Sequence, residues 1–357
     1  MKSMCDYIKR TPQTVENLVR HIEEDSEAFV RKMLERMPSA IYLVGSGTSL
    51  NAAYFAQHAM EKVLSIPCFV YPAMTFTDTV HTVVENSCVI GISQAGRSSS
   101  TMQALDHARA LGCMSVAVSS EEHALIREHA DVFLPVRMPL EDIGPKTEGC
   151  YCTVVTLVLS MMEVSEKSGR GCREINHKMK QEMLACIDHL PQIVDSTWKW
   201  CEEHGEKLSL YDNIIVVGYG DCIPAALEGA LKILETVRCC IRSYETEEFM
   251  HGIYHSIDRN TMVISIGNAQ RHFDRAKRLL SWLKQVKGAY TIMVTGQRTD
   301  SDDDFIYPFS EYEFFPAFEY LAFFQTLAQH MAEYRGIDYE AQGDPGFHKT
   351  MGSYVYE

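Results

Sequence analysis

The chain of 357 residues lacks several features that would assign it to particular classes of protein. No apolar run approaches the ~18–20 residues of a membrane-spanning helix, and the first residues, Met1 to Asp6, contain no apolar signal core. Positive charge is scarce, because 33 lysines and arginines stand against 48 aspartates and glutamates and leave a formal net charge of −15. Duplex nucleic acids are bound by basic surfaces. We therefore expect a cytoplasmic protein that binds neither membranes nor nucleic acid.

The cysteines do not follow the patterns of disulfide-rich or zinc-finger domains. A chain this long needs no disulfide framework for its twelve cysteines. Cys88, Cys113 and Cys186 lie inside apolar segments, where a reduced cysteine packs as a small hydrophobic side chain. Cys150-x-Cys152 and Cys239-Cys240 have no partner pairs at zinc-finger spacing. Buried thiols are the interpretation that this pattern favours.

Two other familiar cofactor motifs are also incomplete. His251 and His255 have the spacing of a helical zinc pair, but Gly252 stands where that motif requires glutamate. The Gly45-x-Gly47 pattern resembles part of a dinucleotide fingerprint, but the next strand, residues 68–72, ends without the acidic residue that would bind a ribose. We therefore expect no metal site and no cofactor.

One pattern of apolar strands occurs twice in the sequence. Asp131 and Asp304, which precede matching strands, are 173 positions apart. A repeat of this length is a whole domain, since solenoid units have periods of roughly 20–50 residues. The matching strand-like segments are 41–45, 89–93 and 132–135 in the first copy, and 214–218, 263–267 and 305–308 in the second.

Short apolar strands that alternate with amphipathic helices indicate parallel sheets covered on both faces. We therefore expect an α/β protein with two tandem doubly wound parallel-sheet domains. In the first copy, two of the expected helices cover 77–84 and 121–130. The expected organisation is a leading helical segment (1–38), a first α/β domain (39–150), connecting helices (151–205), a second α/β domain (206–340) and a C-terminal tail (341–357).

The first copy has two hydroxyl-rich turns between a strand and a helix, at 45–49 and 93–101. Small residues there let backbone N–H groups and hydroxyls approach an anion at the positive end of a helix. Both turns follow the carboxyl end of a strand, where open α/β sheets bind ligands. Serine and threonine in such turns can also serve only as helix N-caps. Two hydroxyl-rich turns together favour a phosphate site.

The second copy loses these hydroxyls and gains charge on a helix instead. Glu228, Lys232 and Glu235 are spaced i, i+4 and i+7, so they share one face of a helix that is otherwise almost wholly apolar. A solvated, salt-bridged face is one interpretation of this pattern. A charged stripe on a buried helix is costly, however, unless it faces a site. His251, sixteen residues after Glu235, lies in the segment Glu248-Phe249-Met250-His251-Gly252.

With these motifs the chain resembles, over nearly its whole length, the double sugar-isomerase (SIS) domain family. It is similar to the isomerase half of glucosamine-6-phosphate synthase and, more closely in size and organisation, to the fructosamine- and glucoselysine-6-phosphate deglycases. The resemblance implies flavodoxin-like SIS domains, a phosphosugar ligand and a homodimer. In relatives the counterpart of His251 reaches into the active site of the neighbouring subunit.

The resemblance also implies roles for single residues. Glu235 would move a proton between C1 and C2 of the sugar, and His251 would assist ring opening. Lys232 and Glu228 belong to the same catalytic helix. The residues implied in phosphate and sugar binding are Ser46, Gly47, Thr48, Ser49, Ser93, Gln94 and Ser98.

The chain departs from the synthase pattern at several positions. Ala95 and Arg97 replace a serine and a glutamate, and Val154 follows Thr153 where the family has Thr-Lys. Gly352 stands where the Schiff-base lysine of the synthase aligns, and Lys349 lies three residues earlier. We expect no glutaminase domain, and Cys5 does not have the position of an N-terminal nucleophile.

These departures favour deglycation of an amino-acid-linked 6-phosphosugar to a hexose 6-phosphate and an amine. One alternative is an aminosugar-phosphate isomerase or deaminase that resembles glutamine–fructose-6-phosphate transaminase. An alternative of another class is a non-catalytic sugar-phosphate sensor, which the Glu235 and His251 pair disfavours.

Overall fold

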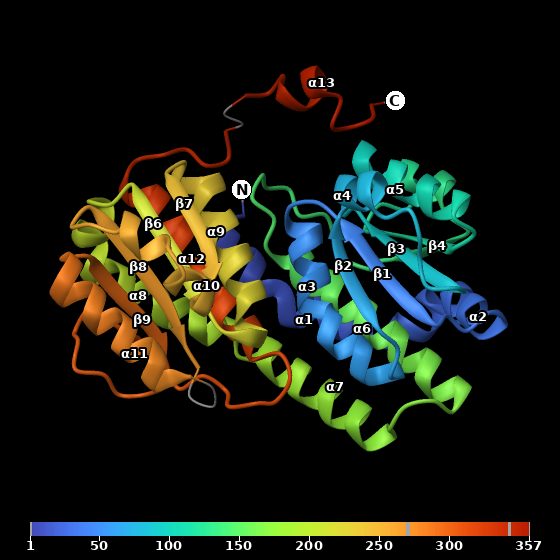
Figure 1. Ribbon diagram of the computed structural model, residues 1–357, viewed down its shortest axis with the longest axis horizontal. Helices are drawn as coiled ribbons and strands as arrows, with labels where there is room; N and C mark the ends of the chain where they lie inside the picture. The colour runs from blue at the N-terminus through green and yellow to red at the C-terminus, as the bar shows by residue number, and fades with distance from the viewer. Residues whose placement is uncertain (1, 269–271, 342–343, 357) are drawn as a thin grey trace. The chain divides into compact units, whose positions relative to one another are not determined.

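The computed structural model of the chain describes residues 2–268, 272–341 and 344–356, and residues 1, 269–271, 342–343 and 357 lie outside the described part (Figure 1). The described residues divide into two compact units, each with one β-sheet. The first-sheet unit comprises residues 11–141, 148–181 and 344–356, and the second-sheet unit comprises residues 2–10, 142–147 and 182–341.

The first sheet has parallel strands in the order β2-β1-β3-β4-β5. Every residue of β1, β3 and β4 is buried, as in a sheet that is covered on both faces. The strands are β1 (Ala40–Gly45), β2 (Cys68–Pro72), β3 (Ser87–Ile92), β4 (Met114–Ser119) and β5 (Val132–Pro135).

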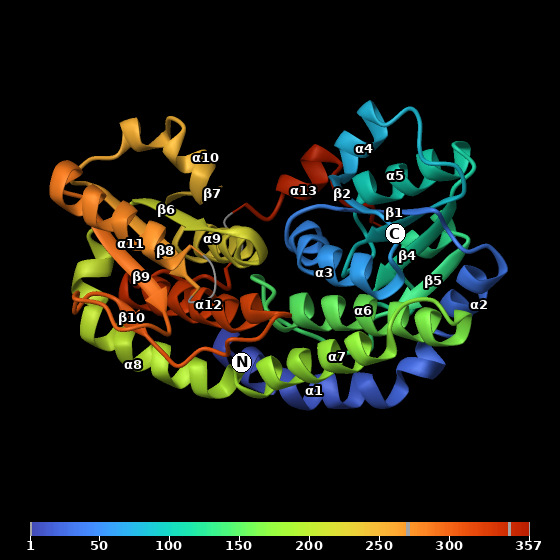
Figure 2. The same cartoon turned by 60° about the horizontal axis from the view of Figure 1, so that its bottom comes forward.

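Helices lie on both faces of this sheet (Figure 2). Phe76 of α4 and Leu105 of α5 pack with Tyr42 and Val44 of β1 on one face, and α3 and α6 pack against each other on the opposite face. The helices with residues in this unit are α1 (Met4–Asp25), α2 (Glu27–Glu35), α3 (Thr48–Leu64), α4 (Ala73–Thr79), α5 (Ser99–Ala110), the 3-10 turn η1 (Leu125–His129), α6 (Glu148–Ser168), α7 (Arg173–Asp188) and α13 (Phe347–Met351); α1 and α7 also contribute residues to the second-sheet unit.

The second sheet repeats this topology with parallel strands in the order β10-β9-β8-β6-β7. Phe249 and Leu279 pack with Val217 and Val263 on one face. The strands are β6 (Asn213–Gly218), β7 (Cys240–Glu245), β8 (Thr261–Gly267), β9 (Tyr290–Thr295) and β10 (Phe305–Ile306). The helices are α8 (Leu190–Ser209), η2 (Gly220–Cys222), α9 (Ile223–Val237), α10 (Thr246–Met250), η3 (Ile253–Ser256), α11 (Phe273–Trp282), the π-helical η4 (Leu283–Lys287) and α12 (Pro316–Tyr334).

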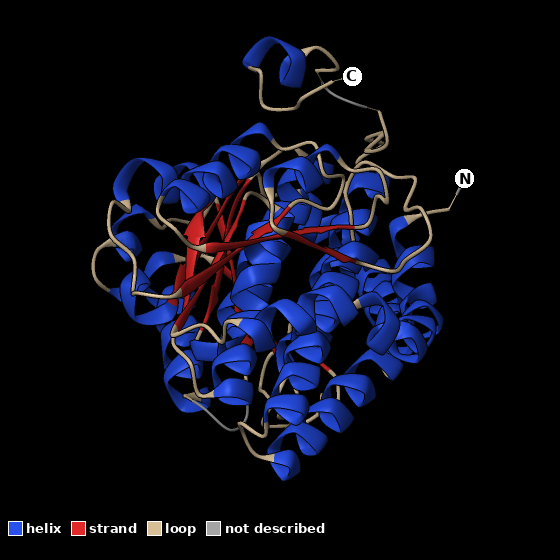
Figure 3. Cartoon of the chain, turned by 90° about the vertical axis from the view of Figure 1, so that its right-hand side faces the viewer, coloured by secondary structure: helices blue, strands red, loops and turns tan. Residues whose placement is uncertain are grey.

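Two parallel sheets of matching strand order, each with helices on its faces, confirm the expected fold of two tandem doubly wound α/β domains (Figure 3). In both sheets the strand that opens the copy lies between the next two strands in the chain. β1 therefore corresponds to β6, and β3 corresponds to β8.

Two expected helices of the first copy are wrong in extent. The helix expected over 77–84 is α4, which begins at Ala73 and ends at Thr79 because Val80 has an extended backbone. The helix expected over 121–130 forms only as the 3-10 turn η1, and residues 121–124 are irregular. The backbone N–H of Ile126 donates to the carbonyl of Gly96, so this segment is tied to the loop after β3 instead of to its own turn.

No helix within the described ranges has both the length and the apolar composition needed to cross a membrane.

Candidate functional site

The first hydroxyl-rich turn joins β1 to the N-terminus of α3. Ser46 and Gly47 are exposed, and Thr48 and Ser49 are half-buried in the first turn of the helix. Gly47 has a φ of +57° at the N-cap, a conformation that L side chains rarely adopt. The turn therefore presents small polar groups at the positive end of α3, as anion binding requires.

The second turn joins β3 to α5 and is held in a tight loop. Gly96 has a φ of +63°, and a Cβ at this position would lie 2.2 Å from the Cβ of Ala124. The Ser93 hydroxyl accepts the backbone N–H of Ser98 at 3.4 Å. The Ser98 hydroxyl in turn accepts the backbone N–H of Thr101 at 3.4 Å. Ser98 is therefore the N-cap of α5. Capping was the alternative to phosphate binding that the sequence left open for the serines of this turn.

The hydroxyls of the two turns meet at Ser100. Its Oγ lies 3.1 Å from the Oγ of Ser98 and 3.5 Å from the Oγ of Ser46. The two turns are adjacent because β1 pairs with β3 in parallel register, which brings their carboxyl ends to the same edge. We call Ser46, Ser98 and Ser100 the hydroxyl cluster. Ser100 was not among the residues predicted to bind phosphate, although it belongs to the same run of serines.

Gln94, expected among the phosphate-binding residues, has its side chain against the N-terminus of α6. An added Cβ on Gly149 would lie 1.8 Å from the Gln94 Nε2, so only glycine leaves room for this amide. The Nε2 donates to the sulfur of Met138 at 3.6 Å, and the backbone carbonyl of Gln94 accepts the hydroxyls of Ser119 and Ser120. These contacts hold Gln94, and with it the start of the second turn, in a fixed position.

The C-terminal tail lies alongside the second turn, which the sequence did not predict. Ser98 and Tyr354 form an antiparallel β-bridge. The backbone N–H of Ser99 donates to the carbonyl of Ser353 at 3.2 Å, and that of Val355 donates to the carbonyl of Arg97 at 2.9 Å. The Ser99 hydroxyl donates to the carbonyl of Gly352 at 2.8 Å. The tail therefore forms one border of the hydroxyl cluster.

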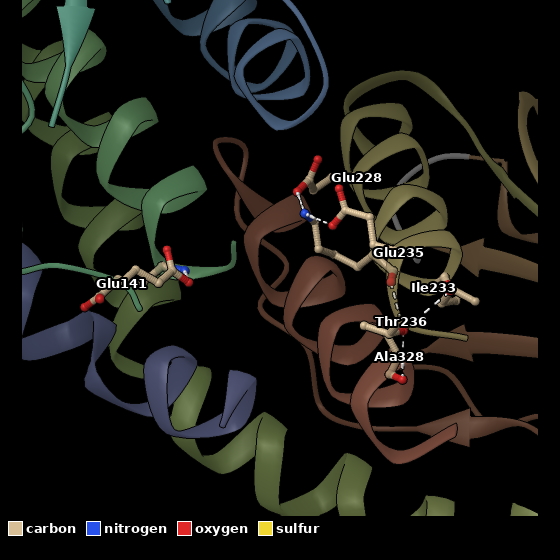
Figure 4. A network of polar contacts seen from close by, with 8 residues as sticks. Glu141, Glu228, Ile233, Glu235, Thr236 and Ala328 are labelled. Atoms are coloured by element: carbon tan, nitrogen blue, oxygen red, sulfur yellow. Dashed lines mark hydrogen bonds and ion pairs between the residues drawn. The ribbon is translucent and has the colours of Figure 1, made fainter. Parts of the chain in front are cut away.

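The charged face of α9 forms the second set of candidate residues (Figure 4). The Lys232 Nζ lies 3.3 Å from the Glu228 Oε1 and 2.6 Å from the Glu235 Oε2. The side chains of Lys232 and Glu228 are 1% and 0% exposed, whereas that of Glu235 is 34% exposed. The structure thus brings together the three charged residues that the spacing predicted.

The apolar face of α9 packs tightly against α12. A Cβ on Gly229 would lie 2.5 Å from the Phe324 ring, and the Thr236 hydroxyl donates to the carbonyl of Ala328 at 3.1 Å (Figure 4). This contact fixes the rotation of α9. The charged face is consequently held in one orientation relative to the second sheet.

Electrostatics keep Lys232 protonated. Burial alone would lower the pKa of Lys232, but the charges of Glu228 and Glu235 and their hydrogen bonds outweigh that effect and raise it. A lysine that retains its proton is a poor nucleophile and serves as a fixed cation. Lys232 therefore neutralises buried Glu228 and orients Glu235, which is the carboxylate of this group best placed to meet a ligand.

His251 lies at the C-cap of α10 and is exposed. Its backbone N–H donates to the carbonyl of Glu248 at 3.1 Å. In the described chain, no hydrogen bond or ion pair joins His251 to Glu235. Gly252 has a φ of +141° and ends the helix, so His251 and His255 do not share one helical face as a zinc pair would. Among the described residues there is no group of three or more potential metal ligands.

A small pocket marks the carboxyl ends of β6 and β8, the positions that correspond to the hydroxyl-rich turns. Its described lining includes two carboxylates and no basic side chain, which does not suit an anion. The lining residues are Tyr219, Asp221, Cys222, Ile266, Asn268, Tyr312, Glu313 and Pro316.

The sequence of the chain is similar to those of known proteins. The model of the SIS domain matches residues 33–164 and 207–304, which is more than half of the chain. A glutamine–fructose-6-phosphate aminotransferase (isomerizing) of Clostridium tetani is 25% identical over 287 residues, or 80% of this chain and 46% of the relative. The corresponding enzyme of Legionella pneumophila (strain Lens) is 27% identical over 78% of this chain and 45% of the relative. The chain thus spans about half the length of these curated relatives.

Solved structures give similar matches. A candidate phosphosugar isomerase from Clostridium difficile 630 has a TM-score of 0.91 and 26% identity, with full coverage of both chains. A candidate sugar-binding protein from Salmonella typhimurium LT2 has a TM-score of 0.80 and 28% identity over 90% of this chain and 98% of the other. The C-terminal domain of an aminotransferase from Francisella tularensis shares the fold, with a TM-score of 0.79 at 20% identity over 95% of this chain and 98% of that one. With two SIS segments and the matching fold, the chain belongs to the SIS domain family.

Proposed function

We propose that this protein is an enzyme that binds a hexose 6-phosphate, assists opening of the sugar ring and moves a proton between C1 and C2. The observation that carries the proposal is the ionic arrangement on α9, in which buried Lys232 orients the half-exposed carboxylate of Glu235. A general base needs this combination of a defined position and access to substrate. The names of the relatives, phosphosugar isomerase and isomerizing aminotransferase, support the same chemistry.

The substrate we favour carries an amine on C1 or C2, and the reaction is deglycation. The phosphate binds at the hydroxyl-rich turns of the first copy, and His251 transfers a proton during ring opening. For a 1-amino-ketose, Glu235 removes a proton from C1 and returns one to C2, which gives a C1=N imine. Water adds to the imine carbon and the C–N bond breaks. The products are a hexose 6-phosphate and the free amine.

Three observations support deglycation over amine transfer. Gly352 stands at the position of the Schiff-base lysine, and Lys349 lies on α13, one turn away. The carbonyl of Gly352 is also engaged by Ser99. Lys232 remains protonated between its two carboxylates. The names of the curated relatives instead favour an aminosugar-phosphate isomerase or deaminase, which is our second candidate.

A product survey separates these candidates. The protein is incubated with fructoselysine 6-phosphate, glucoselysine 6-phosphate, glucosamine 6-phosphate and fructose 6-phosphate, and products are followed by mass spectrometry. Release of lysine from either of the first two compounds supports deglycation. Conversion of only the last two supports the second candidate. Tight binding without turnover of any of them would contradict an enzymatic function and favour a sensor.

The hydroxyl cluster provides a test of phosphate binding. Replacing Ser46 and Ser100 together by alanine is expected to raise KM about tenfold or more, because each hydrogen bond to a charged group contributes ~1.5–3 kcal/mol. The melting temperature should barely change, since Ser98 supplies the N-cap of α5. Ser98→Ala is the matched comparison and should lower both stability and affinity. An unchanged KM in the double variant would exclude the cluster from phosphate binding.

We further propose that the active protein is a homodimer with shared sites. Chains carrying Glu235→Gln and chains carrying His251→Asn, each inactive alone, are mixed and allowed to exchange. If the two residues of one site come from different subunits, mixed dimers regain one intact site of two and activity returns. Exchange confirmed by native mass spectrometry without recovered activity would show that the sites are not shared.

A further inference from the structure

The carboxylate of Glu247 lies at the edge of the second sheet that corresponds to the hydroxyl-rich edge of the first. Tyr219 follows β6 and Arg275 lies in the first turn of α11, after β8. The Tyr219 Oη donates to the Glu247 Oε1 at 3.0 Å. The Arg275 Nη2 donates to the Glu247 Oε2 at 2.7 Å, and its Nε donates to the Oε1. Groups from both corresponding turns of the second copy thus converge on one carboxylate.

The charge states of Glu247 and Tyr219 favour the hydrogen bonds between these groups. Hydrogen bonds from Arg275 hold the pKa of Glu247 below its ordinary value. Burial, followed by the hydrogen bond to Glu247, raises the pKa of Tyr219 to about 12. Glu247 is therefore ionised and Tyr219 protonated at neutral pH. The ring of His272 lies against that of Tyr219, with 4.5 Å between their centroids.

The same carboxylate belongs to the short segment that carries His251. α10 has only five residues, and His251 follows it directly. Phe249 anchors α10 in the core of the second sheet, where its side chain is 0% exposed. Glu247 joins α10 to Tyr219 and Arg275, which lie on other elements. Since Gly252 ends the helix immediately after His251, the placement of the histidine depends on how firmly this single turn is held.

We propose that Glu247, Arg275 and Tyr219 form an internal anion clamp, in which the protein's own carboxylate takes the anion position of the second copy and positions the turn that carries His251. The role in catalysis rests on the function proposed above, whereas the clamp itself does not. The three residues are positioning residues, since they act on substrate only through His251. The clamp also explains why the second copy carries no hydroxyl cluster.

An ordinary surface ion pair formed by another residue of α11 serves as a control. Lys277 and Asp300 are 3.2 Å apart, and the aspartate side chain is 93% exposed. Such single contacts contribute little to stability. The contact of Arg275 with Glu247 is bidentate and has Tyr219 as a third partner, which makes it stronger and more directional.

The test compares Glu247→Gln with Asp300→Asn by hydrogen-exchange mass spectrometry and steady-state kinetics. Glu247→Gln should speed exchange in residues 246–256 and lower kcat about tenfold, because small misplacements of a catalytic group are costly. KM should stay within about twofold, since phosphate binding is in the first copy. Asp300→Asn should change neither exchange in 246–256 nor kcat.

Chemical rescue adds a readout that a general loss of stability would not produce. In Glu247→Ala, added formate should bind to Arg275 and Tyr219 and restore both protection of 246–256 and kcat. The double variant Glu247→Ala/Arg275→Ala should not respond to formate.

Unchanged exchange in 246–256 would overturn the clamp, and faster exchange with normal kcat would overturn its positioning role. If the parent protein turns over no 6-phosphosugar, the proposed function fails, and exchange with formate rescue still decides whether the clamp exists.

Discussion

Replacing Glu235 by glutamine is expected to lower kcat by about 10²–10⁴-fold, the usual contribution of a general base. The amide keeps the size of the side chain and can still accept a hydrogen bond from Lys232, but it cannot remove a proton from carbon. KM should change by no more than about twofold, because the proposed phosphate site lies in the hydroxyl-rich turns of the first copy. Steady-state kinetics on a substrate found in the product survey measure both quantities.

Glu163→Gln is a matched control for this variant. Glu163 also forms an ion pair on a helix surface, with Lys167 at 3.4 Å, and its side chain is 17% exposed. Both variants remove one carboxylate charge from a helical pair, so both should shift the melting temperature slightly. Only Glu235→Gln should slow turnover. Turnover at nearly the parental rate would show that Glu235 is not the base and that its charge serves the stability of α9.

Replacing Lys232 by methionine is expected to destabilise the fold by about 3–5 kcal/mol, the usual cost of removing one partner from a buried ion pair. Methionine fills much of the same volume, but it removes the ammonium group that neutralises Glu228, which is 0% exposed. Chemical denaturation at neutral pH measures the loss. A change of less than about 1 kcal/mol, the size typical of exposed pairs, would contradict this account of the buried face.

The destabilisation by Lys232→Met should depend on pH. Without the lysine charge, burial is expected to raise the pKa of Glu228 in the folded variant above its unfolded value. Below that unfolded pKa the carboxyl is protonated in both states, and the penalty disappears; as the pH rises through the raised folded pKa, the penalty grows. Denaturation at pH 5 and pH 8 tests this direction. The double variant Glu228→Gln/Lys232→Met should recover part of the loss at pH 8.

The sequence was sufficient to predict the features that follow from regular spacing. Apolar strands that alternate with helices gave both sheets, because a parallel strand buried on two faces is a continuous apolar run. The i, i+4, i+7 spacing placed Glu228, Lys232 and Glu235 on one face, and the structure joins them through the lysine. The two hydroxyl-rich turns met because their strands are neighbours.

Contacts between residues far apart in the chain could not be predicted in this way. The tail residue Tyr354 forms a β-bridge with Ser98. Such a bridge uses backbone groups that nearly every residue carries, so no side-chain pattern in the sequence predicts it. The contact of Glu247 with Arg275 joins two exposed charges that read in the sequence as ordinary surface residues. The segment 121–130 was expected as one helix, but the backbone N–H of Ile126 donates to the carbonyl of Gly96 in another loop, and no local pattern reveals that contact.

The most direct test of the central claim uses fructoselysine 6-phosphate with both C1 hydrogens replaced by deuterium. Proton transfer from C1 to C2 removes one deuterium from C1, and the account predicts glucose 6-phosphate that retains a single deuterium at C1, formed about 10²–10⁴-fold more slowly by Glu235→Gln. Nuclear magnetic resonance and mass spectrometry of the isolated sugar phosphate give the position and number of deuterium atoms. Direct displacement of the amine would instead give fructose 6-phosphate with both deuterium atoms at C1, and that product would contradict the account.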